Sequence, residues 1–132
     1  MLTNAAPIPP ARATGDVISM FSNSYANVPV DTWSASWDQA NVADIQIGGN
    51  STKKYSNLVF SGIEFTSAPI NATSMTNFHM DIWTPDATTF HIKLVDFGAD
   101  GFNPYKISDV RPVGIGILIA DGSLIFIYNS VI

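Results

Sequence analysis

The stretch FHMDIW, residues 78–83, decides the fold class of this chain. Apolar residues alternate in it with polar or aromatic ones, in the order Phe78, His79, Met80, Asp81, Ile82 and Trp83. Successive side chains of a β-strand point to opposite faces, so this alternation predicts a strand with one face in a core. The stretch TTFHIKLVDF, residues 88–97, continues the pattern with apolar Phe90, Ile92 and Leu94. The two stretches predict a hairpin around the turn TPDA.

The apolar sides of these two strands can share one face only in certain registers. A turn centred on Asp86 satisfies this condition, and it sets Asp81 opposite His91 and His79 opposite Lys93. The face away from the core is then expected to hold one patch of His79, Asp81, Trp83, His91 and Lys93. Two interpretations stay open: a solvated sheet face with weak cross-strand charge pairs, or a ligand-binding surface.

Strands and turns fill the remaining sequence from Asp16 onward, and no segment has the pattern of an amphipathic helix. The segment VADIQIGGN ends in a Gly-Gly-Asn turn, and the long strand after it carries a candidate bulge at Ser61–Gly62. The dipeptide Asp121–Gly122 predicts a two-residue hairpin between the last two apolar segments. About seven or eight short strands predict an all-β fold, an antiparallel β-sandwich of jelly-roll type.

The length of 132 residues predicts one β-sandwich domain, residues 16–132, after a flexible Pro/Ala-rich arm, residues 1–15. Six Lys and Arg against eleven Asp and Glu give a net charge of −5, which argues against a nucleic-acid partner. The chain has no cysteine, which excludes disulfides and thiolate metal sites.

No run of about 18 apolar residues is present, so no membrane insertion is expected. Charged residues are 13% of the chain, against about 25% in typical soluble domains, which suits an extracellular or particle-surface protein. The first residues do not have the pattern of a signal peptide. The chain is therefore expected to be either an excised secreted module or a protein of a virus particle.

Four phrases carry a family resemblance: DVISMFSNSYANVPVDTW, KKYSNLVFSGIEF, MTNFHMDIWTPD and FHIKLVDFGADG. They resemble a β-sandwich module of secreted Bacteroidota proteins, often found beside laminarinase-type glycoside hydrolases. The resemblance implies a galactose-binding-like jelly roll that binds carbohydrate without catalysis. The closing GILIADGSLIFIYNSVI also fits the family, but Asn23 and Tyr128 stand where the family has Asp. A structural calcium ion is therefore left open, and no other cofactor is expected.

The chain departs from this family after Gly101, where Phe102–Pro104 lead almost directly to KISDVRPVG. Two strands of the family are missing there, which predicts an uncovered sheet edge. The final segment SLIFIYNSVI is apolar on both faces, so a neighbouring chain is expected to cover it. This favours a homo-oligomer or a larger assembly. The alternative function is thus a virion structural protein, such as a bacteriophage spike, fibre or capsid-surface protein, completed by oligomerisation.

The polar residues do not form a recognisable catalytic motif. Glu64 is the only glutamate, and Asp96 and Asp100 lie in a Gly-rich turn, so a pair of glycosidase carboxylates is not predicted. No GxSxG motif is present, and neither GGNST nor the Gly114–Gly116 segment has the pattern of a phosphate loop. His79 and His91 flank Asp81 in the proposed register, which fits either a charge pair or a divalent metal site. We expect no enzyme.

Aromatic residues give the clearest functional prediction, because sugar rings stack on exposed Trp or Tyr side chains. Trp33 and Trp37 lie four residues apart beside a polar loop, with Tyr25 upstream, and one of the two tryptophans is expected in the core. The sequence therefore predicts a module that binds a polysaccharide or a cell-surface glycan. Its expected ligand-binding residues are Trp83, Asp81, His79, His91, Trp37 and Tyr25.

Overall fold

The computed structural model is an all-β protein, as the sequence predicts. The structure describes residues 2–68, 70–72, 74–96, 112–119 and 125–131. These residues form a short 3-10 helix, η1 (Thr14–Asp16), and seven strands: β1 (Ser19–Phe21), β2 (Gln39–Ile47), β3 (Asn50–Glu64), β4 (His79–Trp83), β5 (Phe90–Asp96), β6 (Pro112–Ile119) and β7 (Ile125–Val131). Within these ranges, no helix has the length and apolar character that crossing a membrane would require.

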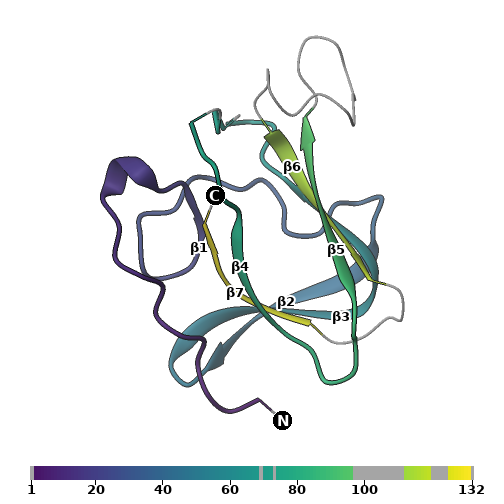
Figure 1. Cartoon of the computed structure of the whole chain (residues 1–132). Coiled ribbons are helices and arrows are strands. Elements are labelled where there is room, and N and C mark those ends of the chain that lie inside the picture. Colours follow the sequence, from purple (N-terminus) through teal and green to yellow (C-terminus); the bar gives the residue numbers. More distant parts are fainter. Residues whose placement is uncertain (1, 69, 73, 97–111, 120–124, 132) are drawn as a thin grey trace.

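The long strand β3 organises the sheet, because three other strands pair with it (Figure 1). β2 runs antiparallel along one edge of β3. On the other edge, β7 pairs with residues 53–55 and β6 with residues 60–64. β4 pairs with β7, β5 pairs with β6, and the short β1 lies beside the end of β7.

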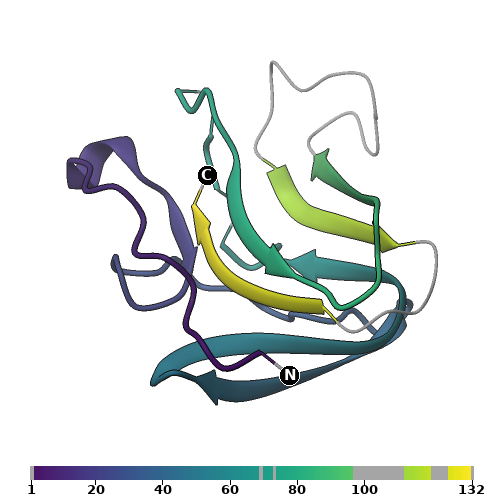
Figure 2. The ribbon, with the colours of Figure 1, turned by 60° about the horizontal axis from the view of Figure 1, so that its bottom comes forward.

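The strand β3 bends between its two halves. Asn41 pairs with Ser56 whereas Gln39 pairs with Phe60, so β3 has extra residues at this point. Asn57 has a φ of 51°, a conformation that asparagine adopts more readily than most residues. Extra residues bend a strand, and β3 changes its partner here from β7 to β6. The sheet thereby divides into two parts, the β4–β7 arm and the β5–β6 arm, which Figure 2 shows as separate pairs.

The turn between β2 and β3 is the predicted Gly-Gly-Asn turn. Ile47 pairs with Asn50, and the two residues between them, Gly48 and Gly49, have φ values of 58° and 80°. Two-residue hairpins of type I′ need positive φ at both positions, and glycine adopts it without a steric cost. This hairpin prediction is confirmed.

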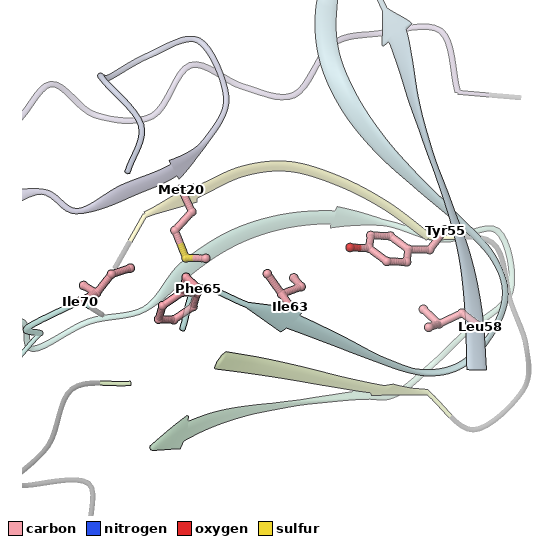
Figure 3. Packing of buried hydrophobic residues seen from close by; sticks show 6 residues of the cluster. All are labelled: Met20, Tyr55, Leu58, Ile63, Phe65 and Ile70. Atoms are coloured by element: carbon pink, nitrogen blue, oxygen red, sulfur yellow. The ribbon is translucent and has the colours of Figure 1, made fainter. Parts of the chain in front are cut away.

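One hydrophobic core lies between the two arms. Its buried residues, which Figure 3 shows, are Met20, Tyr55, Leu58, Ile63, Phe65 and Ile70. Phe78, Met80 and Ile82 pack against them from β4 and its preceding residue, and Ile92 and Leu94 pack against them from β5. His79 and His91 are exposed, so the predicted alternation is confirmed for Phe78–Ile82 and for His91–Leu94. It is wrong for Phe90, which is 40% exposed, and for Trp83, which is half-buried.

The pairing predicted for these two strands is wrong. β4 pairs with β7 and β5 pairs with β6, so Asp81 does not lie opposite His91, nor His79 opposite Lys93. The alternation of side chains fixes which face of a strand meets the core. It does not fix the neighbouring strand, because strands in different arms can send apolar side chains into the same core.

Three further expectations change with this topology. Ser61 and Gly62 pair regularly with β6, so the predicted bulge lies earlier, at the bend near Asn57. β6 and β7 do not pair with each other, so the hairpin predicted between the last two apolar segments is wrong. The Asp121–Gly122 turn lies outside the described residues, as do Asp100 and Phe102–Pro104. β7 has β4 on one edge and β3 and β1 on the other, so it is not an uncovered edge. The expectation that a neighbouring chain covers the apolar faces of this segment, and with it the oligomer, stays a prediction.

Candidate functional site

The structure distributes the six predicted ligand-binding residues over three places. Tyr25 and His79 line one cavity, and Asp81 is next to His79. Trp37 lies against the second half of β3 and His91 lies on β5, on the same side of the bend, and Trp83 belongs to a small cluster at the β2–β3 hairpin. The single patch expected from the hairpin therefore does not exist.

The cavity lies between the N-terminal arm and the segment that leads into β4, and its volume is about 750 Å³. The hydroxyl of Tyr25 donates a hydrogen bond to the carbonyl of Pro10 (2.9 Å) and accepts one from the backbone N–H of Arg12 (3.1 Å). These bonds hold residues 10–12 against the domain. On β4, His79 Nε2 lies 3.4 Å from the carboxylate of Asp81.

Trp83 is half-buried rather than a free stacking surface. It packs against the buried Ile47 of β2, which Ile45 of β2 and Leu2 and Ala6 of the N-terminal arm also contact. Figure 2 shows this arm, in purple, passing the β2–β3 hairpin before it reaches η1. Trp83 therefore serves as a packing residue between β4, the hairpin and the arm.

Trp37 is the most exposed large aromatic residue in the described part of the chain, with 58% of its surface exposed against 40% for Phe90. Its ring stacks on Phe60 at a centroid distance of 6.1 Å and an interplanar angle of 22°. Its Nε1–H donates to Oε1 of Glu64 at 2.8 Å. A Cβ atom added at Gly62 would lie 2.5 Å from the Trp37 ring, so only glycine permits this close approach. Trp37 is thus held in one orientation along the outside of β3.

Asp38 fixes the loop that carries Trp37. Its carboxylate accepts hydrogen bonds from the hydroxyls of Ser34 and Ser61, each at 2.9 Å, and from the backbone N–H of Gly62 at 3.1 Å. The backbone N–H of Ala35 also donates to the carbonyl of Gly62 at 2.9 Å. Residues 31–38, which we call the Trp37 loop, therefore lie against the second half of β3.

Asp31 anchors the beginning of the Trp37 loop. The backbone N–H of Ser67 donates to its carboxylate at 2.8 Å and the Thr66 hydroxyl at 3.1 Å. The Ser67 N–H, first among these donors, lowers the pKa of Asp31 below its ordinary value of 3.8.

This anchor is expected to weaken in acid. A lowered folded-state pKa gives a stability contribution that is fully present above pH 3.8 and is lost as the pH falls through the folded value. Thermal unfolding of the wild type and of Asp31→Asn should therefore differ at neutral pH, and the difference should shrink below pH 3.8. An equal difference at all pH values would show that the Asp31 carboxylate does not stabilise the loop by its charge.

His91 lies on the same face of the sheet as Trp37. The register gives two rows across β3, β6 and β5: first Phe60, Leu118 and His91, then Gly62, Gly116 and Lys93. Directly paired residues project to the same face of a sheet, and Trp37 covers that face at Gly62. Neighbouring strands are about 4.8 Å apart, and β6 lies between β3 and β5. His91 and Lys93 of β5 therefore lie about 10 Å from β3. We call this surface, made of Trp37, Phe60, Glu64, His91 and Lys93, the outer face.

Sequence reasoning missed Glu64 and Asp38 as residues of this site. Glu64 binds the Trp37 ring from β3, 27 positions along the chain, and Asp38 ends the Trp37 loop and binds Ser61 and Gly62 of β3. The prediction that one of Trp33 and Trp37 lies in the core is confirmed, because Trp33 packs against the core. Lys53 lies over the Trp33 ring, 4.9 Å from its centroid.

The described residues contain no group of three His, Asp or Glu side chains that could hold a metal ion. The diagonal pair of His79 and His91 is not formed, because the two residues belong to different arms. The metal site considered for these histidines is therefore wrong.

No protein-family model matches the chain, and no curated protein or solved structure matches it either. The resemblance to the Bacteroidota module thus depends on the quoted sequence phrases. The outer face and the cavity are the two surfaces of the described residues whose geometry suits a ligand.

Proposed function

We propose that this protein is a non-catalytic carbohydrate-binding module and that the outer face is its glycan-binding surface. The observation that carries the proposal is the exposed, oriented ring of Trp37. We also propose that the two arms are the layers of a jelly-roll β-sandwich. A secreted or particle-surface location would bring the module to its polysaccharide.

Stacking on Trp37 would supply the apolar part of the binding. The C–H groups on one face of a pyranose ring suit the π surface of an indole. Phe60 and Gly62 back the Trp37 ring, so stacking requires little rearrangement of the protein. An anchor that is already ordered loses less conformational entropy when its ligand binds.

Polar groups at the rim of the outer face would orient the sugar. Glu64 uses one carboxylate oxygen for the Trp37 indole and has further acceptor capacity for sugar hydroxyls. His91 is exposed on the opposite side and can donate or accept a hydrogen bond. An aromatic ring face surrounded by such polar groups is the usual arrangement at sites that bind sugars.

Replacement of Trp37 by alanine is expected to abolish most of the glycan affinity. Loss of a central aromatic anchor costs about 2 kcal/mol, which is roughly 30-fold in Kd. A glycan array would first identify the ligand, and titration calorimetry would then compare the wild type, Trp37→Ala and Trp37→Phe. Phenylalanine keeps a stacking surface without the indole N–H, so its loss should be smaller.

Lys54→Gln is the matched control, because Lys54 lies in the first half of β3, away from the outer face and from the cavity. Its polysaccharide affinity should equal that of the wild type. Unchanged binding by Trp37→Ala, or the absence of any glycan ligand in the array and at millimolar sugar, would falsify the proposal.

A further inference from the structure

We propose that the cavity beside the N-terminal arm is a second binding site, for a single sugar ring that carries a carboxylate, such as a hexuronic acid. Its volume of about 750 Å³ is in the range of small-molecule sites, which span roughly 300–1,000 Å³. The site is separate from the outer face, since Trp37, Glu64 and His91 do not line it.

The walls of this cavity combine two kinds of surface. Apolar residues of the lining include Pro9, Pro10 and Tyr25, and Phe78 borders the cavity while it packs against the core. Hydroxyl and amide groups come from Ser74, Thr76 and Asn77, and the Asn77 amide donates to the Thr76 hydroxyl at 2.9 Å. A ring with one apolar face and several hydroxyls matches this combination.

Arg12 supplies the preference for a carboxylate. Arg12 lines the cavity. The ion pairs in the described part of the chain are Lys53–Asp44 and His79–Asp81. Within that part of the chain, the Arg12 guanidinium therefore has no carboxylate partner. The planar guanidinium fork matches a carboxylate with two parallel hydrogen bonds. Asp16 lines the same cavity and can accept hydrogen bonds from sugar hydroxyls.

The N-terminal arm positions Arg12 through its backbone. The Arg12 N–H and the Pro10 carbonyl both bind the hydroxyl of Tyr25. Exchange of the Arg12 side chain therefore leaves this anchor in place, so the guanidinium can be tested alone. Tyr25→Phe removes the anchor and keeps the guanidinium, which makes a complementary variant.

The test compares three ligands that differ only at C6: D-glucuronate, D-glucuronamide and D-glucose. Calorimetry and ligand-observed NMR on the full chain should show the tightest binding for D-glucuronate. Arg12→Gln should weaken D-glucuronate roughly tenfold or more and leave D-glucose unchanged, because a charge-assisted pair is lost. Arg12→Lys should recover part of the affinity, and Tyr25→Phe should weaken D-glucuronate through the loosened arm. Lys54→Gln, a charge change on β3, should have no effect.

Each alternative result overturns the inference. Equal affinity for the three ligands, or no effect of Arg12→Gln, would mean that the cavity does not select a carboxylate. No binding of any of the three at millimolar concentration would mean that the cavity is not a sugar site. Loss of D-glucuronate binding in Trp37→Ala would place this ligand on the outer face instead. Polysaccharide binding that depends on Trp37 can persist in every case, so this inference and the proposed function fail separately.

Discussion

Replacement of Tyr55 by alanine is expected to remove a large part of the stability of the fold. Tyr55 is completely buried, and its hydroxyl donates to the carbonyl of Trp33 at 2.5 Å. Burial raises the pKa of Tyr55 above its ordinary value of 10.0, so the hydroxyl stays protonated and can donate. Truncation of a buried aromatic ring costs about 3–5 kcal/mol, against a total stability of about 5–15 kcal/mol. Urea unfolding followed by tryptophan fluorescence measures the loss.

Tyr55→Phe separates the ring from the hydroxyl. It keeps the buried surface and removes one hydrogen bond, which should cost about 1–2 kcal/mol. The Ser61 hydroxyl lies 3.3 Å from the same Trp33 carbonyl, but its single hydrogen bonds the Asp38 carboxylate at 2.9 Å, so the carbonyl loses its main donor. If Tyr55→Ala were as stable as Tyr55→Phe, the core between the two arms would not depend on this ring.

Replacement of Asp38 by alanine is expected to release the Trp37 loop and to lower glycan affinity together with stability. The carboxylate accepts bonds from Ser34, Ser61 and the Gly62 N–H, and two of these donors, Ser61 and Gly62, are buried. Hydrogen bonds to a charged group contribute about 1.5–3 kcal/mol each, and buried donors left unpaired add to the cost. The bonds to the two buried donors alone therefore predict a loss of about 3 kcal/mol or more in urea unfolding.

Asp38→Asn tests the contribution of the charge at constant size. The amide keeps one acceptor oxygen but turns its NH2 group toward other donors, so an intermediate stability is expected. Glycan affinity should follow the same order as stability, wild type, Asp38→Asn and Asp38→Ala. Full glycan affinity in folded Asp38→Ala would contradict the positioning role of Asp38.

Local features of this fold are predictable from the sequence, whereas its strand partners are not. The alternation around Met80 and Ile92 gives the faces of β4 and β5, and Gly48–Gly49 gives the β2–β3 hairpin, because both depend on neighbouring residues. The partners of β4 and β5 depend on the bend at Asn57, which divides the sheet into two arms. The local signal in residues 84–89 does not distinguish a hairpin from a crossover between arms.

The candidate site follows the same rule. Trp37 is recognisable as a candidate because an exposed tryptophan is unusual, but its support by Glu64 and Gly62 depends on contacts between distant segments. His79 and His91 each face outward as expected, yet they serve different surfaces because their strands are in different arms. Residue type therefore predicts the chemistry, and the topology decides which residues act together.

The central place of β7 also sets the order of folding during synthesis. β7 is the last described strand to leave the ribosome, yet it fills the space between β4 and the first half of β3. Until residue 131 has emerged, β3 and β4 each carry an unpaired edge that can associate with other nascent chains. Pairing between such distant segments is slow, because loop-closure entropy is lost before the contacts form. The part of the sheet around β7 therefore cannot close while β7 is still inside the ribosomal tunnel.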